Sequence, residues 1–140
     1  NASNIYIKKK MEMAKLLNFQ FSYIKLDSYS TESKIINLIE RLNNNKNIHG
    51  IVLQIPISTK TRIDSFNCLN SIKNDKDVEG LNFYHTALLN HGCVDRVYVP
   101  CVAASALSII ELAGWHVRGL NVTIIGCGIT AGRFLCSPSL

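Results

Sequence analysis

The sequence lacks any long apolar run, although 47% of its 140 residues are apolar. A helix that spans a bilayer needs roughly 20 consecutive apolar residues, so the sequence predicts no membrane segment and no membrane partner. The apolar content is high enough for a folded domain rather than a disordered chain. A chain of this length accommodates one ordinary domain with a real core, and it is too short for two. Internal repeats and long low-complexity segments are also absent.

A C-x-x-C pair is missing too, although the chain has five cysteines. They are Cys68, Cys93, Cys101, Cys127 and Cys136. Their odd number and irregular spacing argue against a disulfide framework and against a zinc site. We therefore expect no metal, and reduced thiols that mostly pack as small apolar side chains in an intracellular protein.

A basic stripe interleaved with aromatic residues is likewise absent, although the net charge is +5. The lysines are scattered along the chain, so the charge predicts only weak and nonspecific attraction to nucleic acid. We expect no nucleic-acid partner, because an anionic substrate accounts for the positive charge equally well.

The order of helical and extended patterns predicts the fold class. Apolar residues at helical spacing predict helices over residues 3–17, 31–42, 63–72, 83–89 and 103–113. Alternating or continuous apolar runs predict strands over 19–26, 48–57 and 121–125. The polar segment 73–80 predicts a loop. Strands that alternate with helices indicate an α/β domain with a mostly parallel sheet flanked by helices.

Lys10 is the one lysine of the first predicted helix that falls in its apolar sector, one turn after Tyr6. In one interpretation its aliphatic stem packs against the protein while the ammonium reaches water. In the other it lies in a cleft, where a lysine can shuttle protons near neutral pH. The residues alone leave both interpretations open.

Gln54 and Glu79 are polar residues next to apolar segments. Gln54 interrupts the predicted strand 48–57 near its C-terminal end, where open α/β sheets bind ligands. A buried amide needs hydrogen-bond partners, so Gln54 is either a structural residue or a ligand-binding one. The carboxylates of loop 73–80 are expected to be mostly solvated, and they are too few for a calcium site. Only Glu79, next to Gly80, indicates a carboxylate held at a site.

The predicted strand 121–125 leads directly into the glycine-rich segment Gly126-Cys127-Gly128-Ile129-Thr130-Ala131-Gly132. Such a turn between a strand and a helix lets backbone amides approach a pyrophosphate. The spacing G-x-G-x-x-x-G is one residue longer than the common dinucleotide fingerprint. The motif is therefore a weak indication by itself, and it is the only support for an unrelated dinucleotide-binding module.

Taken in order, these features resemble the methylenetetrahydrofolate dehydrogenase/cyclohydrolase family. The family motif S-x-x-Y-x-x-x-K is matched by residues 3–10, and the motif G-x-x-x-Q-x-P by residues 50–56. The motif K-D-V-D-G is matched by residues 76–80, with Glu79 in place of the second Asp. The family segments P-C-T-P-x-G and G-x-S-x-x-x-G are matched less well, at residues 100–105 and 126–132. The resemblance extends over essentially all 140 residues.

The resemblance implies a bifunctional parent enzyme of one-carbon metabolism. It would oxidise methylenetetrahydrofolate to methenyltetrahydrofolate with NADP or NAD, and would hydrolyse the product to formyltetrahydrofolate. Lys10 would be the catalytic lysine that moves protons during hydrolysis. A homodimer in the cytoplasm, a mitochondrion or another organelle is implied for the parent.

The resemblance also assigns the binding residues. Tetrahydrofolate would be bound by Tyr6, Leu53, Gln54, Ile55 and Glu79. Within this set, Tyr6 would orient the folate, Gln54 would hold Lys10 in a productive position, and Glu79 would anchor the pterin ring. The nucleotide would be bound by Gly126, Cys127, Gly128 and Gly132.

The resemblance divides the chain near residue 118. Residues 1–118 are expected to form the folate-binding catalytic domain with an incomplete N-terminus, and residues 119–140 only the opening of a Rossmann-like NAD(P)-binding domain. Two departures from the family pattern are Glu79, where the family has Asp, and a glycine loop without the usual Arg and Ser. We expect this chain alone to lack dehydrogenase activity and nucleotide binding. The alternative is a degenerate or truncated homologue without catalytic activity.

Overall fold

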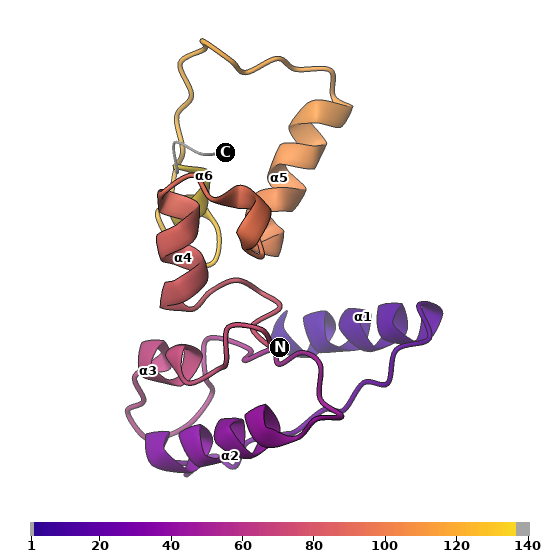
Figure 1. The fold of residues 1–140 in the computed structure, drawn as a ribbon, viewed down its shortest axis with the longest axis vertical. Coiled ribbons are helices and arrows are strands. Elements are labelled where there is room, and N and C mark those ends of the chain that lie inside the picture. Colours follow the sequence, from indigo (N-terminus) through magenta and orange to yellow (C-terminus); the bar gives the residue numbers. More distant parts are fainter. Residues whose placement is uncertain (1, 137–140) are drawn as a thin grey trace.

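A computed structural model describes the backbone of residues 2–136 and the side chains of residues 5–136. Residue 1 and residues 137–140, the end of the expected nucleotide-binding segment, lie outside the described part. The elements shown in Figure 1 are α1 (Ala2–Leu16), α2 (Glu32–Asn44), α3 (Ser65–Asn70), α4 (Phe83–Asn90), η1 (Val94–Arg96), α5 (Cys101–Leu112) and α6 (Gly132–Leu135). Within residues 2–136, no helix is both long enough and apolar enough to cross a membrane.

The described residues form no β-sheet, so the expectation of a mostly parallel sheet flanked by helices is wrong. The only bridge in this part of the chain is a single parallel one between Ile51 and Asp77. The segments expected to be strands, 19–26, 48–57 and 121–125, run without regular secondary structure. An alternating or apolar pattern favours extended backbone, but a strand exists only where a neighbouring strand supplies a ladder of hydrogen bonds. Here that neighbour is missing.

The helices expected from apolar spacing are confirmed, with small shifts at their ends. Thr31, Asp64 and Asn82 precede α2, α3 and α4, and the side-chain oxygen of each accepts a hydrogen bond from a backbone N–H of the following turn. These residue types are preferred N-caps because they satisfy amides that have no partner inside the helix. The local sequence therefore sets where these helices begin.

The main hydrophobic core lies between α2, α3 and the segment 48–57. Its buried members are Ile35, Ile39, Ile51, Leu53, Cys68, Leu69 and Ile72. A second, smaller core holds α4, α5 and α6 together through Leu89, Ala103 and Phe134. Figure 1 shows the corresponding two groups of helices, one below and one above. Leu81 packs against both cores and so joins them.

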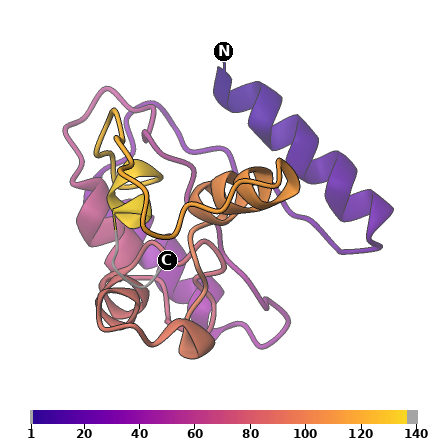
Figure 2. The same ribbon diagram turned by 90° about the horizontal axis from the view of Figure 1, so that it is seen from above.

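Helix α1 lies at the side of the molecule, as Figures 1 and 2 show from two directions. Its covered face is narrow: among the side chains of residues 5–16, only Ala14 is buried and only Ile7 and Lys10 are half-buried. The apolar side chains of Met11 and Met13, and the ring of Tyr6, are exposed. Residues 7, 10 and 14 follow helical spacing, so α1 contacts the protein along one line that includes Lys10.

Candidate functional site

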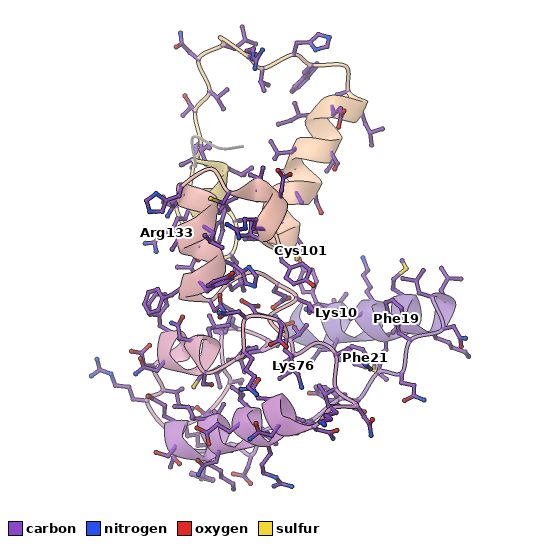
Figure 3. All side chains as sticks on the ribbon, viewed as in Figure 1. Lys10, Phe19, Phe21, Lys76, Cys101 and Arg133 are labelled. Carbon is purple, nitrogen blue, oxygen red and sulfur yellow. The ribbon has the colours of Figure 1, made fainter. Side chains whose placement is uncertain are left out.

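Lys10 and Glu79 form the charged centre of the candidate site. Lys10 Nζ donates a hydrogen bond of 2.9 Å to Glu79 Oε1. The two side chains expose 34% and 18% of their surface, so the ion pair is partly desolvated yet reachable from solvent. The other lysines of α1, at positions 8, 9 and 15, are exposed. Figure 3 shows Lys10 where α1 meets the central loops.

The backbone that carries Glu79 is held by a buried carboxylate, Asp77, which is 1% exposed. Asp77 Oδ1 accepts hydrogen bonds from the backbone N–H groups of Glu79 (3.3 Å) and Gly80 (3.1 Å). Asp77 Oδ2 accepts another from the N–H of Asn82 at 2.8 Å. A buried charge with this many donors is satisfied, and it fixes the course of the loop at Glu79.

Lys76, which directly precedes Asp77, is also buried and exposes 8% of its surface. Its Nζ donates to the carbonyl oxygens of Leu42 (3.2 Å), Asn43 (2.8 Å) and Asn45 (2.8 Å), at the end of α2. Carbonyls at a helix C-terminus lack partners inside the helix, and a cation is favourable there. Lys76 therefore fastens loop 73–80 to α2.

Burial of Asp77 corrects the expectation that the carboxylates of loop 73–80 are mostly solvated. Polarity predicted correctly that the segment is a loop, and Asp75 is exposed. Lys76 and Asp77 are buried because backbone groups of the same loop and of α2 satisfy their charges. Sequence analysis did not single out either residue. The available signal was their position directly before Val78 and Glu79 in the matched motif.

Two glycines let neighbouring segments pack closely against this loop. Gly80 has a φ of 65°, and a Cβ there would lie 1.9 Å from the carbonyl oxygen of Tyr98. A Cβ at Gly50 would lie 2.7 Å from Val78 Cγ1. A left-handed backbone suits glycine, and glycine is also the only residue type that leaves room for the carbonyl oxygen of Tyr98 at this position. The turn after Glu79 therefore depends on it.

Among the described residues, no hydrogen bond or ion pair joins Lys10 to the other residues expected at the folate site. Tyr6, one turn away on α1, is 61% exposed. Gln54 Nε2 donates to the carbonyl oxygen of Ile55 at 3.1 Å, and among the described residues no hydrogen bond joins Gln54 to Lys10. Leu53 is buried in the main core, and Ile55 packs against it. Their roles toward folate stay predictions.

The glycine-rich segment forms a tight turn. A Cβ at Gly132 would lie 1.8 Å from the carbonyl oxygen of Gly126, so the first and last glycines of the motif touch. Cys127 and Gly128 are exposed, and the turn leads into the four-residue helix α6. Figures 1 and 2 both place this turn away from α1. The segment does not by itself build a nucleotide pocket or reach Lys10.

The five cysteines are free thiols, and Cys68 differs from the others in its burial. Burial raises the pKa of the Cys68 thiol, and the nearby carboxylates of Glu32 and Asp64 raise it further. A buried thiol in these surroundings is an unreactive packing residue. Among the described residues, no group of three or more His, Cys, Asp or Glu side chains is placed to hold a metal ion.

Comparison with known proteins gives consistent matches. The sequence profile of the tetrahydrofolate dehydrogenase/cyclohydrolase catalytic domain matches residues 1–79, a range that includes Lys10 and Glu79. The bifunctional protein FolD of Brucella anthropi is 36% identical over 133 residues, which cover 94% of this chain and 44% of that protein. The bifunctional protein FolD of Brucella ovis gives the same identity and coverage. The chain thus spans less than half the length of these relatives.

Solved structures agree with the sequence matches. The Trypanosoma brucei N5,N10-methylenetetrahydrofolate dehydrogenase-cyclohydrolase, complexed with NADP and an inhibitor, superimposes with a TM-score of 0.90 at 26% identity. The match covers 98% of this chain and 46% of that one. The bifunctional FolD enzyme of Campylobacter jejuni gives a TM-score of 0.88 at 26% identity, over 97% of this chain and 47% of that one.

Proposed function

Because the chain belongs to the tetrahydrofolate dehydrogenase/cyclohydrolase family, we propose that it is part of a longer bifunctional folate enzyme, called the full-length enzyme below. That enzyme oxidises methylenetetrahydrofolate to methenyltetrahydrofolate and hydrolyses the product to formyltetrahydrofolate. The chain matches 44% of the length of the FolD relative, which supports the proposal that it is one part of a longer enzyme. Residues 1–118 are assigned to the folate-binding domain and residues 119–140 to the opening of the nucleotide-binding domain.

The ion pair between Lys10 and Glu79 carries the proposal for hydrolysis. Water adds to the methenyl carbon and loses a proton; one carbon–nitrogen bond then breaks as its nitrogen gains a proton and the new hydroxyl loses its proton to become the formyl carbonyl. A side chain that takes up and returns the proton accelerates both steps. Lys10 Nζ is suited to this role because it is half-buried and held in place by Glu79 at 2.9 Å.

Glu79 is the residue that we assign to the pterin ring. A carboxylate has two acceptor oxygens, and Lys10 contacts Oε1. Oε2 can accept hydrogen bonds from N–H donors of a pterin while Oε1 keeps its contact with Lys10. The carboxylate would then place the folate and the catalytic lysine relative to each other. Tyr6 is assigned to the same substrate because it lies one helical turn from Lys10 on an exposed face.

The oxidative reaction needs a nicotinamide dinucleotide, which accepts the hydride from methylenetetrahydrofolate when bound. The NADP complex of the Trypanosoma brucei relative supports NADP, with NAD as the other candidate. Cys127 and Gly128 of the glycine turn are exposed, Gly132 is buried, and the described helix α6 has four residues. These residues do not fit the nucleotide without further protein, so we assign no oxidative step to them. We place the full-length enzyme inside the cell as a homodimer, in the cytoplasm or an organelle.

Two assays on the purified full-length enzyme test the proposal. The first follows formation of methenyltetrahydrofolate from methylenetetrahydrofolate with NADP or NAD. The second follows loss of the methenyl absorbance without any nucleotide. We expect turnover in both. A folded full-length protein that binds tetrahydrofolate but turns over neither substrate would instead be the non-catalytic homologue.

A further inference from the structure

We propose that Lys76 is a positioning residue for the folate-binding carboxylate of Glu79, an inference that rests on the function proposed above. Lys76 does not reach Glu79 itself, because its three ammonium donors point to the carbonyl oxygens at the end of α2. Its effect on Glu79 therefore passes through the backbone of the loop. Figure 3 shows Lys76 between α2 and the position of Lys10.

Lys76 joins three separate segments of the chain. Its side chain binds α2, and its carbonyl oxygen accepts a hydrogen bond of 2.8 Å from the N–H of Ile51. Its own N–H donates to the carbonyl oxygen of Lys73 at 2.9 Å, which tightens the turn of the loop. The segment that leads to Gln54 and the loop that carries Glu79 are thus fastened to one helix end through a single residue.

The fixed course of the loop continues from Lys76 to Glu79. Asp77 follows directly and binds the N–H groups of Glu79 and Gly80. Gly80 then turns against the carbonyl oxygen of Tyr98 with no space for a side chain. Between these two fixed points the backbone of Glu79 has little freedom, so the carboxylate is aimed at Lys10. Loss of the hydrogen bonds between Lys76 and α2 would let the backbone at Asp77, the first of these two points, move.

Removal of the ammonium should loosen the loop without unfolding the domain. Lys76→Met keeps the aliphatic stem but leaves the carbonyl oxygens of α2 without their cation, which is unfavourable for buried groups. Helix α2 is still held by Ile35 and Ile39 in the main core. We therefore expect the substitution to alter the position of loop 73–80 and, through that loop, to weaken folate binding by Glu79.

The matched control is Lys73→Met. Lys73 belongs to the same loop and approaches the same end of α2, where its Nζ lies 3.4 Å from Asn44 Oδ1. It is exposed, however, and its partner is another exposed side chain. Both variants remove one positive charge from the loop. A difference between them therefore reports the buried anchor rather than the net charge.

The test is a double-mutant cycle in the full-length enzyme, with the dissociation constant of tetrahydrofolate measured by calorimetry and the melting temperature measured in parallel. Lys76→Met should weaken binding by about tenfold to a hundredfold, the effect of losing a hydrogen bond to a charged group. Lys73→Met should change it by less than about twofold, as expected for an exposed side chain with one exposed hydrogen-bond partner. In a Glu79→Ala background, Lys76→Met should have no further effect, because the group that it positions is already gone.

Two results would overturn the proposal. One is an unchanged dissociation constant in Lys76→Met with only a lower melting temperature, which would make Lys76 a helix cap and nothing more. The other is an equal loss of binding in the Glu79→Ala background. If Lys76→Met does not fold, Lys76→Gln takes its place in the cycle, because it keeps one amide donor. Failure of the proposed function is recognised separately, since the unmodified enzyme would then bind no tetrahydrofolate or would turn over neither substrate.

Discussion

Lys10 Nζ and Glu79 Oε1 lie 2.9 Å apart, although 69 positions separate the two residues in the sequence. The contact connects α1 to the loop that Lys76 and Asp77 hold in place. The family pattern that the chain resembles has Asp where Glu79 stands. One additional carbon–carbon bond extends the carboxylate by about 1.5 Å, so Glu79 reaches further from the backbone of the loop than an Asp at this position would.

Glu79→Asp tests what the longer side chain does. The shorter carboxylate cannot keep the 2.9 Å contact with Lys10 unless the loop moves, and it returns to the geometry of the family pattern. We expect tighter tetrahydrofolate binding in the full-length enzyme, because both carboxylate oxygens become available to the pterin. Glu79→Ala is the matched comparison and should weaken binding. If both variants behave like the unmodified enzyme, the carboxylate at position 79 has no part in the site.

A pair of glycine substitutions tests whether the turn after Glu79 is rigid. Gly80 and Gly114 have similar positive φ values, 65° and 71°, but only Gly80 is crowded. Gly114→Ala should lower the free energy of unfolding by about 1–2 kcal/mol, the cost of a left-handed conformation. Gly80→Ala should cost more, because the carbonyl of Tyr98 must also move. Chemical denaturation of both variants measures the difference, and equal losses would show that the turn adapts easily.

The thiols should differ in reactivity according to burial. Cys68 is fully buried and its pKa is raised, so little thiolate forms at neutral pH. Cys101 and Cys127 are exposed. Brief treatment with iodoacetamide at neutral pH, followed by peptide mass spectrometry, should therefore label Cys101 and Cys127 long before Cys68. Because the thiolate is the reactive form, early labelling of Cys68 would mean that the main core opens readily.

The 140-residue chain by itself should not bind NADP or NAD. Cys127 and Gly128 of its glycine turn are exposed, and α6 provides four helical residues behind the turn. The described residues offer no sheet that would complete a nucleotide pocket. Isothermal calorimetry with each nucleotide should give no heat of binding up to high micromolar concentration. Binding in the micromolar range would show that the turn alone is a sufficient nucleotide site.

The sequence predicted the helices well because their signals are local. Thr31, Asp64 and Asn82 mark helix starts through bonds that each residue makes within one turn. The strands could not be predicted in the same way. Residues 19–26 have a suitable alternation, but pairing depends on a neighbouring strand that these residues do not contain. The expected sheet was therefore wrong although the expected helices were right.

The candidate site was predictable only in part, for a similar reason. Helical spacing placed Lys10 on the inner face of its helix, and its half-buried position agrees. The position of Glu79, the partner of Lys10 in the ion pair, depends on Lys76 and Asp77. These two residues are buried because backbone groups of α2 and of the loop satisfy their charges. Local pattern carries no information about these distant carbonyl and amide groups. The same limit applies to Gln54, which bonds to Ile55 rather than to Lys10.

The most direct test of the account is the hydrolysis rate of Lys10→Met in the full-length enzyme, compared with Lys9→Met. Lys9 is the exposed neighbour on the same helix, so its substitution removes the same charge without touching Glu79. We expect Lys10→Met to fold and to lose methenyl hydrolysis by at least about a hundredfold, the contribution of a positioned proton-transfer group. Lys9→Met should retain the unmodified rate. Hydrolysis at the unmodified rate in folded Lys10→Met would contradict the assignment of Lys10 as the catalytic residue.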